Sequence, residues 1–134
     1  MRWFFLCLKG VIMTYNDIDV VLYKILRYIS ECMKAGTPVD YEQLQSQSGY
    51  LNIPESYLMQ VLHMAVSNGL IEGLKRIATK DFTGYVQSGE IVLTLAGNDF
   101  MRDNNGMHKA AELLGATFEA VLSGIIQSTI AKMK

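Results

Sequence analysis

The sequence predicts a mainly helical α+β fold, in which a winged helix-turn-helix is followed by a long C-terminal amphipathic helix. Three observations support this. Apolar residues recur at helical spacing over residues 17–35, two shorter helical segments joined by a turn follow, and the hydrophobic period then changes to that of strands. The 134 residues are the usual size of one domain. We divide them into a flexible N-terminal extension (1–13), a winged-helix domain (14–106) and a C-terminal helix (107–134).

The first helix is predicted over residues 17–35. Charged residues interrupt its apolar positions at regular intervals, so one side is expected to face the core and the other water. Asn16 or Thr14 is the expected N-cap, and Gly36-Thr37-Pro38 ends the helix. The apolar side carries Ile18, Val21, Leu22, Ile25, Leu26, Ile29, Cys32 and Met33. The exposed side carries Asp19, Lys24, Arg27, Glu31 and Lys34.

Two shorter helices are expected next, in the pattern of a helix-turn-helix. The first covers about 41–47, after Asp40. The second starts at Pro54, whose missing N–H costs nothing in a first helical turn, and it ends near Asn68-Gly69. This second helix would be the recognition helix. Its outward side is expected to carry Ser56, Met59, Gln60, His63 and Ser67.

A β-hairpin is predicted after the recognition helix. Residues 70–77 and 90–94 have the pattern of strands, and the polar, glycine-containing stretch 79–89 is expected to form the loop between them. The tip of this hairpin would be the wing. Thr94 is expected to cap one more helix, which runs to about Asn105 and ends in the Asn104-Asn105-Gly106 turn.

The C-terminal helix combines an apolar stripe with a ridge of small side chains at every fourth position. Charged and polar residues interrupt the run, which favours packing in a soluble protein over a membrane span. So apolar a helix must cover the flank of its own domain or a second copy. We expect a homodimer, with packing inside one chain as the alternative. The residues expected at the dimer interface are Leu114, Phe118, Val121, Leu122 and Ile125 of the stripe and Ala116, Ala120 and Gly124 of the ridge.

The remaining composition argues against several classes of function. Cys7 and Cys32, like His63 and His108, lack the spacing of a zinc site or a disulfide framework, so we expect reduced thiols, a cytoplasmic protein, and no metal or cofactor. No catalytic motif occurs at a spacing that suits its chemistry, so we expect no catalytic residues and no enzyme. The apolar run at 3–8 is too short for a membrane span and lacks a cleavage site; a short packing arm is the alternative to a flexible extension.

The distribution of charge favours the wing over the recognition helix as the DNA contact. The net charge is −1, and residues 36–70 contain three carboxylates (Asp40, Glu42, Glu55) but no Lys or Arg to hold phosphates. A Gln on the recognition helix can read adenine, and the hairpin supplies the positive charge. The candidate contacts to double-stranded DNA are Lys75, Arg76, Lys80, Gln60, Ser56 and His63. The alternative is a protein-interaction module whose acidic helix faces another protein.

Four stretches carry a family resemblance: LYKILRYI at 22–29, IPESY at 53–57, NGLIEG at 68–73 and LTLAGNDFM at 93–101. Over about 17–120 the chain resembles the YjcQ-type family of small bacterial and phage proteins. The resemblance implies a winged-helix fold and an origin in Gram-positive bacteria and their prophages, and it supplies no catalytic or binding residues. We therefore expect a phage- or prophage-associated protein that acts as a DNA-binding or regulatory factor.

Overall fold

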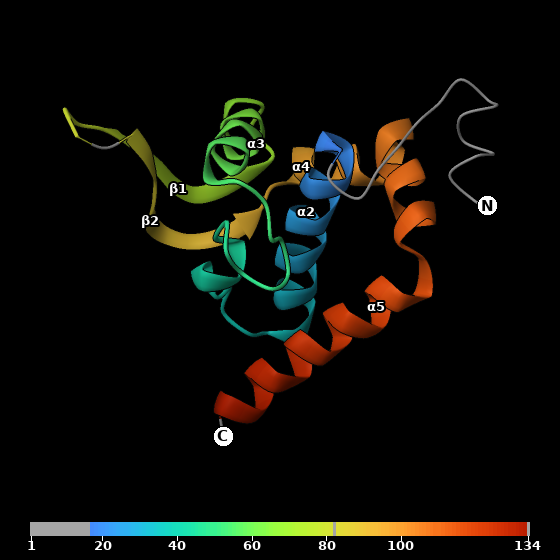
Figure 1. Cartoon of the computed structure of the whole chain (residues 1–134). Coiled ribbons are helices and arrows are strands. Elements are labelled where there is room, and N and C mark those ends of the chain that lie inside the picture. The colour runs from blue at the N-terminus through green and yellow to red at the C-terminus, as the bar shows by residue number, and fades with distance from the viewer. Residues whose placement is uncertain (1–16, 82, 134) are drawn as a thin grey trace.

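The computed structural model describes residues 17–81 and 83–133 (Figure 1). The predicted extension over 1–13 and the predicted caps Thr14 and Asn16 lie outside them. The mainly helical α+β prediction is confirmed: helices are followed by an antiparallel hairpin and a long C-terminal helix. In chain order the elements are α2 (Ile18–Ala35), the 3₁₀ helix η1 (Tyr41–Leu44), α3 (Glu55–Ser67), β1 (Ile71–Ala78), β2 (Thr83–Leu93), α4 (Leu95–Asp103) and α5 (Asn105–Met133).

Helix α2 is the centre of the molecule. Its buried residues include the consecutive Val20, Val21, Leu22 and Tyr23, so burial extends around the whole circumference rather than along one stripe. Figure 1 shows why: α3 and the hairpin lie on one side of α2, and α5 crosses the other. The helix ends as predicted, because Gly36 adopts the left-handed conformation and its N–H bonds back to the last turn.

The segment between α2 and α3 is less helical than predicted. Only Tyr41–Leu44 is helical, as a 3₁₀ turn, and the expected helix over 41–47 is wrong. The hydroxyl of Ser48 explains the early end, because it accepts the N–H of Leu51 and donates to the carbonyl of Gln43, turning the chain back. On α3, Met59 is half-buried rather than outward, because it shares the edge of the buried face with Leu62 three residues on.

The hairpin is longer than predicted. Its strands reach Ala78 and begin again at Thr83, so most of the expected loop over 79–89 belongs to β2. The outer part of the hairpin is largely exposed, so its strand residues need no apolar side chains and have the composition of a loop. The register is irregular near the base, where four residues of β2, 88–91, lie between the partners of Glu72 and Leu74. Gly73 lies at this point with φ 98°.

The C-terminal helix is broken, where the sequence predicted one continuous helix over 107–134. It starts at Asn105, so Gly106 lies in its first turn instead of ending the preceding helix. Only the extended Asn104 separates α4 from α5, and its side chain accepts the N–H of Met107. The break is at Gly115, whose φ of 63° and ψ of −158° are not helical. Figure 1 shows the resulting bend, after which the second half of α5 runs under α2.

The apolar side of α5 packs on α2 within the chain. Met107, Ala110, Leu114, Phe118, Leu122 and Ile126 are buried. Of the residues predicted at a dimer interface, Leu114, Phe118 and Leu122 are thus covered in the same chain and Ile125 is half-buried. The others face solvent: Val121, which is 50% exposed, and the small residues Ala116, Ala120 and Gly124. By length and composition alone, Asn105–Lys132 also passes as a membrane-spanning helix.

Candidate functional site

The outward surface of α3 carries the predicted polar residues. Ser56, Gln60, His63 and Ser67 are exposed there. His63 does not extend freely into solvent, because its Nδ1 lies 3.0 Å from the hydroxyl oxygen of Tyr85 on β2. Its Nε2 lies 3.4 Å from Oγ of Ser67, one turn along the helix. The predicted recognition helix is therefore connected to the predicted wing through His63.

Tyr85 holds the hairpin in place. Its ring is buried, and its carbonyl oxygen accepts a 2.7 Å hydrogen bond from the hydroxyl of Tyr41 in η1. Burial raises the pKa of Tyr41, so this donor keeps its proton at neutral pH. One strand residue thus contacts both η1 and α3. The sequence offered one indication of this role, because Tyr85 is a large aromatic residue among the polar residues 79–89. The prediction of a loop over 79–89 gave it no partner.

The basic residues of the hairpin do not share one surface. Arg76 lies opposite Tyr85 in the strand register, and Lys75 lies opposite Val86. Because directly paired residues share a sheet face and consecutive residues alternate, Arg76 is on the face that Tyr85 turns toward α3, and Lys75 is on the other. Lys80 is in the connection between the strands. The structure therefore brings Arg76, and not Lys75, to the same side as the outward residues of α3.

Two basic residues predicted on an exposed side of α2 are engaged with other elements. Nζ of Lys24 donates to the carbonyl of Tyr50 at 3.3 Å, and burial lowers the pKa of this lysine. Arg27 makes two hydrogen bonds to Glu119 of α5, at 2.6 and 2.9 Å. The prediction that both lie in solvent is wrong, because the polar side of α2 is covered by the second half of α5 and by the turn before α3.

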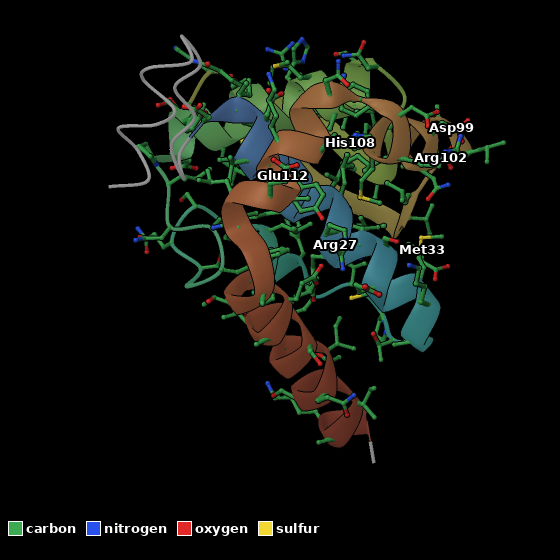
Figure 2. All side chains as sticks on the ribbon, turned by 90° about the vertical axis from the view of Figure 1, so that its right-hand side faces the viewer. Arg27, Met33, Asp99, Arg102, His108 and Glu112 are labelled. Atoms are coloured by element: carbon green, nitrogen blue, oxygen red, sulfur yellow. The ribbon has the colours of Figure 1, made fainter. Side chains whose placement is uncertain are left out.

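The Arg27 cluster joins α2 to α5 by an ion pair. Besides Glu119, Arg27 donates to Glu31 at 2.8 Å and to the hydroxyl of Tyr23 at 2.9 Å. Burial alone would lower the pKa of Arg27, but the hydrogen bonds to Glu119, Tyr23 and Glu31 outweigh it and raise the pKa. Figure 2 shows Arg27 on α2 beside the ribbon of α5. The one signal of this pair in the sequence was a glutamate within the apolar stripe of α5.

An apolar groove lies between α2, the end of α3 and α4. Its volume is about 550 Å³, and Leu22, Met64, Leu70 and Phe100 are among its lining residues. Met64, near the end of α3, is 40% exposed. Within the described residues, no group of three or more His, Cys, Asp and Glu side chains is placed to hold a metal ion. The described surface around α3 thus combines a polar side next to the hairpin with an apolar side next to α4.

Comparison with known proteins places the chain in one family. No curated protein matches it, and neither does any solved structure. Residues 23–117 match the family described as YjcQ protein, and this range covers more than half of the chain, from the first turns of α2 to just beyond the bend in α5. The chain therefore belongs to the YjcQ protein family.

Proposed function

We propose that this protein is a cytoplasmic winged-helix factor of phage or prophage origin that binds double-stranded DNA and regulates its use. The observation that carries the proposal is the junction of His63 and Tyr85, which fixes the hairpin beside α3. Helix, hairpin and Arg76 then form one surface of the kind that enters adjacent grooves of a duplex. Arg76 supplies a phosphate contact, and the outward Gln60 supplies a base contact.

The small number of cations sets the strength of this binding. Arg76 is on the α3 side of the hairpin, Lys80 lies in the connection between the strands, and α3 itself has no Lys or Arg. Each phosphate that is neutralised contributes about −0.9 to the slope of log K against log salt concentration. A monomer with two or three such contacts binds weakly, so the proposal includes a homodimer, which doubles them.

The test compares two variants with the same change in charge. Arg76→Ala and Lys75→Ala each remove one cation from adjacent positions on opposite faces of β1. We expect Arg76→Ala to weaken binding to duplex DNA, measured by fluorescence anisotropy at low salt, and to reduce the salt slope by about 1. Lys75→Ala should change the slope much less. Equal effects of the two variants would contradict the proposed orientation, and an absence of binding at low salt would contradict DNA binding itself.

A second candidate is a protein-interaction module on the same scaffold. It is favoured by the charge of residues 36–70, which is −3, and by the apolar groove next to exposed Met64. A segment of net negative charge with an apolar groove at the end of its helix suits a basic, amphipathic segment of another protein. The anisotropy titration separates the two candidates, because this one requires no affinity for duplex DNA at any salt concentration.

A further inference from the structure

The two halves of α5 are separated by a single backbone conformation. Gly115 has φ 63° and ψ −158°, a combination that is essentially restricted to glycine. A Cβ atom added to Gly115 would meet no heavy atom within 4 Å. A side chain at this residue would therefore be opposed by the backbone angles alone and not by a neighbouring atom. With helical angles at Gly115, α5 would be one straight helix, and its second half, residues 116–133, would leave α2.

The second half of α5 has one face suited to packing, and that face is occupied. Phe118, Leu122 and Ile126 are buried against the rest of the chain. The opposite face presents mostly small residues, with Val121 as its exposed large apolar side chain. Small residues bury little apolar area, so this outer face offers a weak basis for a dimer in water. A strong dimer through this helix has to use the face that now lies on α2.

The contact between α2 and residues 116–133 has a specific ionic register. Arg27 holds Glu119 through two hydrogen bonds and is itself oriented by Glu31 and Tyr23 on α2. A paired guanidinium and carboxylate of this kind fix the direction as well as the position of the helix. The same contact forms equally well whether Glu119 comes from the same chain or from a second copy.

We propose that two copies of this chain form a dimer by exchanging residues 116–133. Straightening at Gly115 carries the second half of each α5 onto α2 of the other copy, where Phe118 and Leu122 are buried again and Glu119 of one copy binds Arg27 of the other. Such an exchange needs no new interface, because it reuses the contact already made within one chain. The inference deepens the dimer of the proposed function and is independent of DNA binding.

The decisive experiment mixes two variants with opposite charge at the contact. Arg27→Glu places carboxylates on both sides of the contact, and Glu119→Arg places guanidinium groups on both. In each variant alone, residues 27 and 119 therefore repel each other, both in a monomer and in an exchanged dimer of two identical copies. A mixed, exchanged dimer restores an opposite-charge pair at both contacts. We expect native mass spectrometry of an equimolar mixture to show a dimer containing one copy of each variant. Two separate monomers, or only self-paired dimers, would overturn the proposal.

A second variant keeps the test valid if the charge variants do not fold. Gly115→Ala disfavours the bent conformation without adding a steric clash, so it should shift the equilibrium toward the straight, exchanged form. We expect the association constant of the dimer, measured by analytical ultracentrifugation, to rise about 10-fold or more. Gly124→Ala is the matched control, since this helical glycine also has open space around it and lies after the bend. It should leave the constant near that of the unchanged chain. A Gly115→Ala protein as monomeric as the control, folded or unfolded, would refute exchange.

Discussion

At the scale of single residues, Tyr50 connects three parts of the chain. It lies in the turn before α3 and contacts both α2 and α5. Its hydroxyl donates a 2.7 Å hydrogen bond to the carbonyl of Lys24, and its own carbonyl accepts from the ammonium group of that lysine. Its ring stacks on Phe118 and lies tilted against Tyr28. Burial raises the pKa of Tyr50 and, likewise, that of Tyr28.

These buried phenols predict a loss of stability at alkaline pH. An unfolded tyrosine ionises near pH 10, while burial keeps Tyr50 protonated in the folded state. Its contribution is therefore fully present below about pH 10 and is lost as the pH rises further. Tyr50→Phe should lower the free energy of unfolding by about 0.5–1.5 kcal/mol at pH 7. It should also make the decline above about pH 10 shallower in urea titrations. An unchanged alkaline slope would contradict the role of this phenol.

Gly73 is the residue at which the hairpin tolerates no side chain. It has φ 98°, and an added Cβ would lie closer than van der Waals contact to the carbonyl of Glu90. Gly73→Ala should therefore cost about 2–4 kcal/mol, from backbone strain together with the clash. Gly89→Ala is the control in the facing strand, where a Cβ meets nothing within 4 Å. Thermal unfolding should show a large loss of Tm for Gly73→Ala alone, and similar losses in both variants would be evidence against the close approach of Gly73 to Glu90.

At the scale of elements, the sequence predicts best what depends on local period. The spacing of Leu114, Phe118 and Leu122 correctly marks the buried stripe of α5, and the outward positions of Gln60 and His63 follow from the helical period of α3. The outer hairpin was mistaken for a loop, because exposed strand residues have no apolar alternation to reveal them. The bend at Gly115 was missed because an isolated glycine is usually tolerated inside a helix.

Contacts between elements distant in sequence were beyond the reach of these patterns. Arg27 and Glu119 are 92 positions apart, and neither helical period indicates that the polar side of one helix meets a carboxylate of the other. The bond between His63 and Tyr85 depends in the same way on the strand register. The basic residues of the hairpin illustrate both what the sequence shows and what it does not. Their charge is visible in the sequence, but only the strand register places Arg76 and Lys75 on different faces of the sheet.

At the scale of the whole molecule, α2 requires α5 as a cover. The predicted division at residue 106 treats the winged helix as a domain that folds without its C-terminal helix. However, α5 contributes Met107, Leu114, Phe118, Leu122 and Ile126 to the described core, and it provides Glu119 to the half-buried Arg27. Each fully buried side chain of this size stabilises by about 1.5–3 kcal/mol. Their sum, on the order of 10 kcal/mol, is comparable to the entire stability of a typical domain.

A chain that ends at Gly106 should therefore fail to fold cooperatively. We expect a broad thermal transition, binding of an apolar dye to the uncovered side of α2, and poor dispersion of its amide signals in NMR spectra. A chain that ends at Ile130 is the matched control, because it keeps every buried residue of α5 in the described chain and Ala131 and Lys132 are exposed. It should melt within a few degrees of the complete chain. If the chain ending at Gly106 instead melts cooperatively at a similar temperature, residues 17–106 form an independent domain and α5 is an accessory to it.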